Sequence, residues 1–301
     1  MTEQRFSRQS VHTIGLIGLG LIAGSFSLAL QASRKSRYRF VGYSRKAENR
    51  EASLARGLVH DVVPSIAELT ACCDVIMIAV PMLAMPDVLA ELAHHVRPDS
   101  IITDAGSVKG SFVAACEAAG LDMRQVVPGH PIAGTEKSGV AAGFAELYRG
   151  RRVVLTPHKQ TSHQATEVVM DLWQACGAEV DMMAVEQHDR VLAATSHLPH
   201  MLAFALVDTL ITRESDEQVF RYAAGGFKDF SRIASSDPVM WRDIALANKT
   251  AVLDAMRDLQ THFDALIAKI ENDDGEAIVQ TFANARDRRD DWLESFLNSR
   301  Q

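Results

Sequence analysis

The chain has 301 residues, of which 47% are hydrophobic and 23% are charged, and its formal net charge is −7. This length corresponds to about two ordinary domains, and the composition excludes a disordered, collagen-like or disulfide-framed protein. A net negative charge argues against a nucleic-acid-binding surface, which normally shows clustered positive charge. The four cysteines have neither disulfide-framework nor metal-ligand spacing, so we interpret them as small buried residues in a reducing compartment.

The first ten residues are polar and contain no apolar core of a signal peptide. No uninterrupted apolar run reaches the roughly 20 residues needed to cross a bilayer. We therefore expect a cytoplasmic protein with no membrane partner and no nucleic-acid partner.

From residue 13 to about residue 183, short β-rich runs alternate with stretches whose apolar residues recur at helical spacing. The run over 74–80 is almost wholly apolar, which is typical of a parallel sheet covered by helices on both faces. The alternation predicts an α/β, doubly wound domain. The expected strands are Thr13–Gly18, Arg39–Tyr43, Asp74–Val80, Ser100–Thr103, Val126–Val127, Arg152–Thr156 and Glu179–Met183, and the helices between them include Leu21–Ser33, Met85–His95 and Ser107–Ala119.

The strand signals stop after about residue 184, and the rest of the chain has the pattern of helices. A long apolar pattern ends near Ile211, and further helices are expected over Pro238–Asp273 and Gly275–Leu297. Asp237 followed by Pro238 is a typical helix start, with Asp as the cap and Pro in the first turn. We predict an N-terminal α/β domain over residues 1–184 and a C-terminal all-helical domain over residues 185–301.

A glycine-rich turn joins the first predicted strand to the first helix. In the pattern GxGxxA, Gly18 permits a tight turn and Gly20 lets the backbone approach a pyrophosphate. The pyrophosphate would lie on the helix N-terminus, where free N–H groups and the helix dipole favour an anion. The strand–turn–helix context favours a dinucleotide-binding loop that includes Gly18, Gly20, Leu21 and Ile22 over a turn that serves helix packing alone.

The end of the second predicted strand bears on which dinucleotide binds. An NAD-binding domain usually has Asp or Glu about 20 residues after the glycines, where it binds the ribose 2′-hydroxyl. This chain instead has Ser44, Arg45 and Lys46, a hydroxyl and two cations that suit a 2′-phosphate. The alternatives are an ordinary solvated turn, or NAD binding through Glu48. We predict NADP as the cofactor, with NAD as the alternative.

Two later loops carry polar residues where a substrate would meet the cofactor. Ser107 follows the strand over 100–103, and His130 follows the strand over 126–127. In an open α/β sheet, ligands bind beyond the carboxyl ends of the strands. Ser107 could instead cap the helix that it opens, and His130 could be a loop histidine bonded to backbone.

The helical half contributes two histidines and an arginine. His197 and His200 are three residues apart and share a helix face, and Pro199 between them predicts a kink because its nitrogen has no hydrogen to donate. The two histidines could bind a metal, but we find no third ligand and predict no metal site. Arg232 could hold a substrate carboxylate or pair with a surface acid.

Five segments together resemble the prephenate and arogenate dehydrogenase family: GLGLIAGS, DAGSVK, GHPIAGTEKSG, SHLPH and GGFKDFSRIASSDPVMWRDI, in this order. The resemblance covers nearly the whole chain from residue 13. It implies an N-terminal Rossmann domain and a C-terminal helical domain that forms a homodimer. It also implies NAD(P)-dependent oxidative decarboxylation of prephenate or arogenate, to 4-hydroxyphenylpyruvate or tyrosine, in tyrosine biosynthesis.

The resemblance further implies roles for single residues. His130 matches the histidine that takes the proton of the substrate hydroxyl, and Ser107 matches a serine that contacts this hydroxyl. Arg232 matches the arginine that binds a substrate carboxylate. Three more residues match positions of the substrate pocket: His197, His200 and Trp241. Many relatives have Gly at the position of Ala23. The family often has an acid near position 44, and Ser44 departs from this pattern, so NAD use is what the departure puts in doubt.

Two other function classes stay open at this point. β-Hydroxyacid dehydrogenases and imine reductases share the same domain organisation, and hydroxyacid chemistry predicts a catalytic lysine on a helix of the second domain. Lys249 and Lys269 lie there, although neither belongs to a comparable polar cluster. A non-catalytic NADP-sensing protein would need neither the paired histidines nor the arginine.

Overall fold

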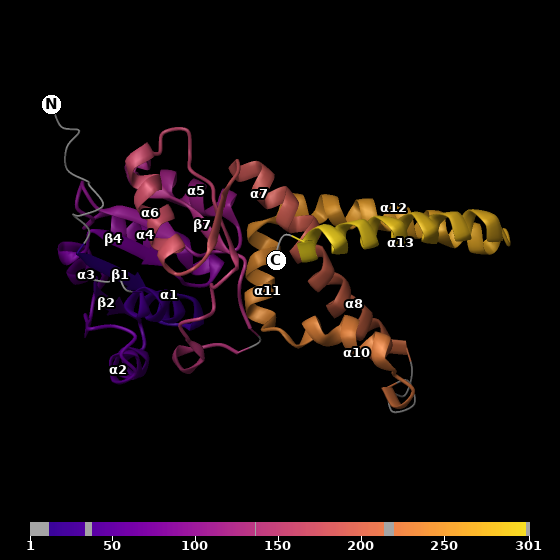
Figure 1. Ribbon diagram of the computed structural model, residues 1–301, viewed down its shortest axis with the longest axis horizontal. Helices are drawn as coiled ribbons and strands as arrows, with labels where there is room; N and C mark the ends of the chain where they lie inside the picture. Colours follow the sequence, from indigo (N-terminus) through magenta and orange to yellow (C-terminus); the bar gives the residue numbers. More distant parts are fainter. Residues whose placement is uncertain (1–11, 34–37, 136, 214–219, 299–301) are drawn as a thin grey trace. The chain divides into compact units, whose positions relative to one another are not determined.

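The structure is a computed structural model that describes residues 12–33, 38–135, 137–213 and 220–298. Contacts within the chain divide it into two compact units, Met1–Lys249 and Thr250–Gln301. Figure 1 shows the elements of both units in chain order. The predicted boundary between residues 184 and 185 lies where the last strand is followed by helices, and it stays a prediction.

A six-stranded parallel sheet forms the centre of the first unit (Figure 1). Its strand order is β3-β2-β1-β4-β5-β6, so the order reverses between β1 and β4, and ligands of such sheets bind beyond the carboxyl ends of the strands at this point. The strands are β1 (Thr13–Ile17), β2 (Arg39–Tyr43), β3 (Asp61–Val62), β4 (Val75–Ile78), β5 (Ile101–Asp104) and β6 (Val126–Val127). The predicted doubly wound α/β fold is confirmed, and β3 is the strand of this sheet that the sequence pattern missed, because two residues show no period.

Both faces of this sheet are buried. In β4, Val75 and Met77 belong to one hydrophobic core, whereas Ile76 and Ile78 belong to the core on the opposite face. This is why the strand is apolar at every position. The first core contains residues of α1 and α6, and the second contains residues of α3, α4 and α5. The helices of this part are α1 (Leu21–Ala32), α2 (Ala47–Ala55), α3 (Ile66–Cys72), α4 (Met85–Ala93), α5 (Lys109–Ala118) and α6 (His163–Ala175).

A second, three-stranded sheet carries His130. It contains β7 (Gly129–Pro131), β8 (Arg152–Leu155) and β9 (Glu179–Met182), with β7 antiparallel to β8 and β8 parallel to β9. The prediction that His130 lies in a loop was wrong, because it lies in β7, opposite Val154 of β8. A three-residue strand that begins with a glycine and ends with a proline has no alternating pattern from which it could be predicted.

The helices after the second sheet differ from the prediction in two places. The break expected at Pro199 is a π-helical segment over Ala193–His197, between α7 (Val185–Leu192) and α8 (Leu198–Arg213). The single helix expected over Pro238–Asp273 is two helices, because Asn248 leaves helical geometry (φ −106°, ψ 34°) between α11 and α12. Among the described residues between α8 and α12, the structure has α10 (Gly225–Ser231), a 3₁₀ helix over Arg232–Ser235, and α11 (Pro238–Ala247).

The predicted start of α11 is confirmed. The side chain of Asp237 accepts hydrogen bonds from the backbone N–H groups of Val239 and Met240, at 2.8 and 3.0 Å, and Pro238 is the first helical residue. An aspartate cap satisfies donors that have no partner inside the helix. This local signal could be predicted from the sequence because it needs only neighbouring residues.

One helical run, Val185–Ile211, is long and apolar enough to cross a membrane by length and composition alone. Core helices of globular proteins also have this length and composition, and this run includes His188, Asp189 and His197. The expectation that the protein has no membrane partner stays a prediction.

The second unit is a helical hairpin formed by α13 (Gly275–Asn298) and by α12 (Lys249–Glu271) from its second residue onward (Figure 1). The Nζ of Lys269 donates to the hydroxyl of Thr281 at 2.7 Å, which joins the two helices. The predicted helix over Gly275–Leu297 is confirmed and ends one residue later.

All four cysteines are free thiols. Cys73, Cys116 and Cys176 are buried, as expected, but the interpretation of Cys72 as buried was wrong, because this residue at the end of α3 is exposed. The reducing compartment and the cytoplasmic location stay predictions.

Candidate active site

The glycine turn between β1 and α1 has the geometry that a pyrophosphate needs. Gly18 has a φ of +92°, and a Cβ at this position would lie 2.3 Å from the carbonyl oxygen of Ala79, so a side chain is excluded. A Cβ at Gly20 would meet no atom within 4 Å, and no side chain caps the N-terminus of α1. The backbone N–H groups at Leu21 and Ile22 therefore begin a helix whose N-terminal end suits an anion.

The end of β2 lies beside this turn, since the N–H of Gly18 donates to the carbonyl of Tyr43 at 3.0 Å. Ser44 is half-buried, and Arg45 and Lys46 are exposed. Arg50, which sequence analysis missed, holds the loop by donating from Nη1 to the carbonyl oxygen of Ser44 at 2.5 Å. The residues present fit a nicotinamide dinucleotide, and residues 44–46 include no acid for a ribose 2′-hydroxyl.

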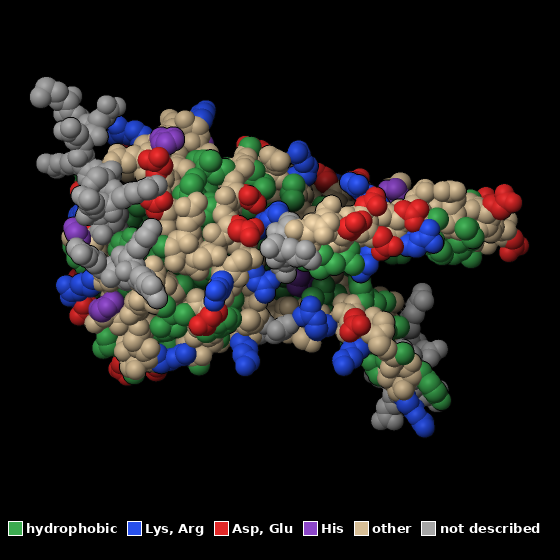
Figure 2. Space-filling model, in the orientation of Figure 1, with side chains coloured by type: hydrophobic (Ala, Val, Ile, Leu, Met, Phe, Trp, Pro, Cys, Tyr) green, Lys and Arg blue, Asp and Glu red, His purple; other side chains and the backbone are tan. Residues whose placement is uncertain are grey.

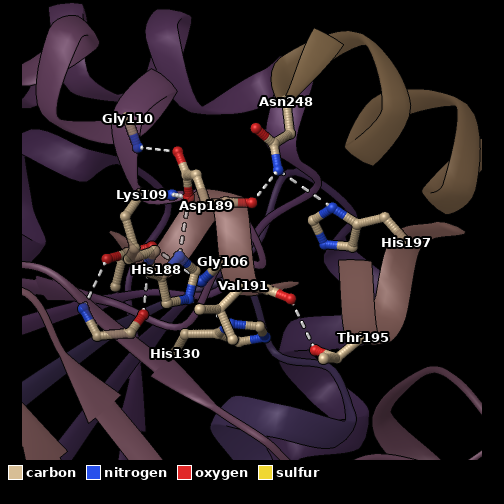
Figure 3. A network of polar contacts seen from close by, with 12 residues as sticks. Gly106, Lys109, Gly110, His130, His188, Asp189, Val191, Thr195, His197 and Asn248 are labelled. Carbon is tan, nitrogen blue, oxygen red and sulfur yellow. Dashed lines mark hydrogen bonds and ion pairs between the residues drawn. The ribbon is translucent and has the colours of Figure 1, made fainter. Parts of the chain in front are cut away.

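His130 and two residues of α7 form a chain of hydrogen bonds (Figure 3). The Nδ1 of His130 lies 2.9 Å from the Nε2 of His188, and the Nδ1 of His188 lies 2.8 Å from Oδ1 of Asp189. Burial, with the nearby His188 and the charge of Lys109, holds the pKa of His130 well below its usual value. His130 is therefore a neutral imidazole near neutral pH, which is the form that can accept a proton.

A buried ion pair fixes the backbone next to His130. Lys109 and Asp104 are both fully buried and pair with each other. Lys109 Nζ also donates to the carbonyl of Gly129 at 2.7 Å, and the N–H of Gly129 donates to Asp104 Oδ1 at 3.0 Å. The N–H of Gly106 donates to Asp104 Oδ2 at 2.8 Å. One carboxylate thus connects the loop of Ser107 to the strand of His130.

Ser107 is half-buried and does not cap α5. This helix begins at Lys109, and its first two N–H groups, those of Lys109 and Gly110, donate to the carboxylate of Asp189 at 2.8 and 2.7 Å. The alternative role of Ser107 as a helix cap was therefore wrong, because a residue of α7 from about 80 positions later occupies that place. The predicted contact of Ser107 with a substrate hydroxyl stays a prediction.

His197 is buried in the π-helical segment and has one ring nitrogen directed by Asn248 (Figure 3). The side-chain amide nitrogen of Asn248 lies 3.2 Å from the Nδ1 of His197 and 2.9 Å from the carbonyl oxygen of Asp189. Because an amide nitrogen only donates, Nδ1 of His197 is the acceptor and Nε2 carries the hydrogen. Burial lowers the pKa of His197 to about 4, so this residue is a neutral hydrogen-bond donor.

His200, Trp241 and Arg232 lie on the same side of the site. The ring of His200 stacks on Trp241 with centroids 3.6 Å apart, and His197 lies 6.1 Å from the same indole. Burial lowers the pKa of His200, its hydrogen bond to the carbonyl of Ser196 acts in the opposite direction, and the charge of Arg232 lowers the pKa further. Among the residues that the structure describes, no three potential metal ligands are grouped.

Two buried donors of this site lack a partner within the described part of the chain: Nε2 of His197 and Nε1 of Trp241. Leaving a buried donor without an acceptor destabilises the protein by about 1–3 kcal/mol, so such donors usually bind a ligand or a water molecule. The structure thus brings together four residues that the sequence predicted for one site: His130, His197, His200 and Trp241.

Five polar residues of this site were not predicted from the sequence: Asp104, Lys109, His188, Asp189 and Asn248. A charged pair around the strand end, Asp104 and Lys109, was the signal available for the first two, since both lie in the segment DAGSVK. His188 and Asp189 lie in α7 and Asn248 ends α11, and apolar spacing does not show which polar side chain of a helical segment turns inward.

Family models of prephenate dehydrogenase match both halves of the chain, the nucleotide-binding domain over residues 26–182 and the dimerization domain over residues 184–284. The cyclohexadienyl dehydrogenase of Zymomonas mobilis is 35% identical over 92% of this chain and 94% of its own length. The chain belongs to the prephenate dehydrogenase family. A prephenate dehydrogenase of Bacillus subtilis is 37% identical over 94% of this chain and 76% of its own length.

Crystal structures of the prephenate dehydrogenase family have the same fold. That of Aquifex aeolicus prephenate dehydrogenase with hydroxyphenyl propionate and NAD+ has a TM-score of 0.88 and 36% identity, and the match covers 95% of this chain and 99% of the other. Synechocystis arogenate dehydrogenase has a TM-score of 0.79 and 27% identity, covering 93% and 99%. Neither the hydroxyacid dehydrogenase nor the NADP-sensing alternative is favoured. Lys269, one of the two lysines considered for hydroxyacid chemistry, donates a hydrogen bond to Thr281.

Proposed function

We propose that this chain catalyses the NAD(P)-dependent oxidative decarboxylation of prephenate or arogenate, a reaction of tyrosine biosynthesis. The observation that carries the proposal is the neutral, buried His130, which lies in one polar network with His188 and near His197 in a chain of the prephenate dehydrogenase family. A neutral imidazole beside the carboxyl edge of a dinucleotide-binding sheet suits the removal of a hydroxyl proton during hydride transfer.

In this proposal His130 takes the proton of the substrate hydroxyl while a hydride leaves the ring carbon that carries this hydroxyl. A bound nicotinamide supplies the hydride acceptor. The bond between the ring and its carboxylate breaks, CO2 departs, and the freed electron pair makes the ring aromatic. The new phenolic oxygen then regains a proton from His130, so that the base is neutral again for the next turnover.

The other predicted residues would bind and orient the substrate. The Nε2–H of His197 and the indole N–H of Trp241 are buried donors that a substrate oxygen would satisfy. Arg232 supplies a cation for a carboxylate near His200, and Ser107 contacts the reacting hydroxyl.

Steady-state kinetics with prephenate and arogenate, each with NAD and NADP, test the proposed function. We expect turnover of at least one substrate, with formation of reduced nicotinamide and CO2 in equal amounts. Turnover of neither substrate with either cofactor would contradict the proposal.

We also propose that NADP is preferred over NAD. The support is the pair of exposed cations, Arg45 and Lys46, at the end of β2, where an acid for the ribose is absent. Because a hydrogen bond to a charged group is worth about 1.5–3 kcal/mol, Arg45→Ala is expected to weaken NADP binding roughly 10- to 100-fold and to change NAD binding little.

Fluorescence titration of both cofactors measures this difference. Arg39→Ala is the matched control, because Arg39 lies at the other end of the same strand and pairs with Asp61. Equal losses for NAD and NADP in Arg45→Ala would show that Arg45 does not face a 2′-phosphate.

We propose that the helical half forms a homodimer. Large apolar side chains are exposed along the hairpin (Figure 2), and contiguous exposed apolar surface usually marks an interface. They include Phe263, Ile267 and Ile270 on one face of α12 and Val279, Phe282, Trp292 and Phe296 on α13.

Phe263→Glu is expected to convert a dimer to a monomer, because it would bury a charge in the interface. Light scattering measures the mass. Ala265→Glu is the control, since helical spacing places Ala265 on another side of α12. A wild-type protein that is monomeric at micromolar concentration would refute the dimer.

A further inference from the structure

The hydrogen-bond chain at His130 ends in a carboxylate that only accepts hydrogen bonds. The carboxylate of Asp189 has a hydrogen bond with Nδ1 of His188 at 2.8 Å. It also accepts hydrogen bonds from two backbone N–H groups of α5, those of Lys109 and Gly110. Burial acts to raise the pKa of Asp189, but the hydrogen bonds from His188 and from these N–H groups hold it below its usual value. The carboxylate is therefore ionised near neutral pH, and all its contacts here must come from donors.

This fixes the direction of each hydrogen bond between Asp189 and His130 (Figure 3). Since the carboxylate accepts, Nδ1 of His188 must carry a hydrogen. With this hydrogen on Nδ1, the Nε2 of His188 is the acceptor, and Nδ1–H of His130 donates to it at 2.9 Å. The remaining nitrogen of His130, Nε2, is left with a lone pair.

Burial makes this arrangement specific. His188 is fully buried, His130 is nearly so, and α7 holds His188 and Asp189 as neighbours in sequence. The backbone carbonyl of Asp189 also accepts from Asn248, whose other amide hydrogen reaches Nδ1 of His197. Asp189 thus contacts, from its side chain and its backbone, the two groups that direct the ring nitrogens of His130 and His197.

We propose that His188 and Asp189 are positioning residues that hold His130 as the Nδ1–H tautomer, so that its Nε2 is the atom that accepts the substrate proton. The arrangement resembles a catalytic triad in that a carboxylate sets the tautomer of a catalytic histidine, but here Asp189 acts on His130 through His188. The kinetic part rests on the proposed function, whereas the tautomer itself is a property of the protein without substrate.

Nuclear magnetic resonance of protein with ¹⁵N-labelled histidine rings tests the tautomer directly, and His130→Asn identifies the signals of His130. In the wild-type protein we expect a protonated Nδ1 and an unprotonated Nε2 on His130. In Asp189→Asn the new amide can donate to Nδ1 of His188, and we expect the protonated nitrogen of His130 to change to Nε2. A protonated Nε2 in the wild type, or the same pattern in both proteins, would overturn the proposal even if the enzyme turns over neither substrate.

Kinetics of two substitutions at His188 separate positioning from packing. The terminal amide oxygen of Gln reaches about as far as Nε2 and can accept from His130, so His188→Gln is expected to keep kcat within about 10-fold of wild type. Leu has a similar volume but no hydrogen-bond acceptor. We therefore expect His188→Leu to lower kcat by at least about 100-fold, with KM and cofactor binding unchanged. Equal losses in the two variants would show that His188 only fills space.

A surface carboxylate of the same helix provides the control. Glu186 is exposed in the first turn of α7, so Glu186→Gln is expected to leave kcat and the ring-nitrogen pattern unchanged. Thermal unfolding of every variant reports whether Asp189→Asn also loosens α5. A drop in kcat that follows the drop in thermal stability across all variants would assign a structural role to Asp189 instead.

Discussion

His130→Asn is expected to lower kcat by about 10²- to 10⁴-fold, the range for loss of a general base, while nicotinamide binding stays unchanged. Asn keeps a polar group of similar reach but cannot take a proton near neutral pH. The glycine turn and the end of β2, which would bind the dinucleotide, do not depend on this side chain. Steady-state kinetics and cofactor titration measure the two properties separately.

His163→Asn is the matched control for this substitution, because His163 is an exposed histidine at the start of α6. It should leave kcat unchanged. A His130→Asn protein with wild-type turnover would show that another group takes the proton.

The same histidine predicts how activity depends on pH. Burial holds the pKa of His130 well below the ordinary value of about 6.5, so the neutral base persists to lower pH than a surface histidine would allow. We expect kcat/KM to fall as the pH decreases through a value below about 6.5, because protonation then removes the base. A pH–rate profile measures this limb, and a midpoint at or above 7 would contradict a buried base.

Lys109→Met is expected to lower the free energy of unfolding by about 3–5 kcal/mol, the usual cost of removing one partner of a buried ion pair. Both charges are fully buried. Burial raises the pKa of Asp104 and lowers that of Lys109, while their mutual attraction opposes both shifts. Without Lys109, the Asp104 carboxylate would stay in the core with no cation beside it. Urea unfolding measures the loss.

Adding Asp104→Asn to Lys109→Met should recover part of this stability, because the remaining polar group is then neutral. Lys159→Met, at an exposed position, is the control and should change the unfolding free energy by less than about 0.5 kcal/mol. A Lys109→Met protein as stable as the control would show that the pair contributes little.

The loss of Lys109 should also affect turnover. Its Nζ holds the carbonyl of Gly129, directly before His130, so a freed Gly129 would let the base move relative to the substrate. The expected signature is a lower kcat in the folded fraction of the protein.

The family, the α/β class and several candidate residues of the site could be predicted from the sequence because their signals are local. The turn at Gly18 needs a positive φ and a close approach to the carbonyl of Ala79. Glycine is the residue that permits both, so its place in the sequence indicates the turn. The buried β4 shows itself by being apolar at every position. Asp237 caps a helix through residues two and three positions away.

Contacts between distant parts of the chain could not be predicted in this way. His130 meets His188 across 58 residues, and Asp189 caps α5 across about 80. Hydrogen bonds between such distant pairs produce no periodic pattern in the sequence. Each of these polar side chains could equally lie in solvent, and only the packing of its helix or strand against the rest of the protein decides. The short β7 also depends on pairing with β8, which forms only when the second sheet assembles.

The sequence by itself thus determined which residue types the proposed site contains: a glycine turn, cations and histidines. Only the tertiary structure decided which ring nitrogen of each histidine is available, because that depends on the partner at the other nitrogen. For His130 the partner is His188 and for His197 it is Asn248, and both choices come from the placement of helices. Burial then keeps both rings neutral, a property that no single segment of the chain has alone.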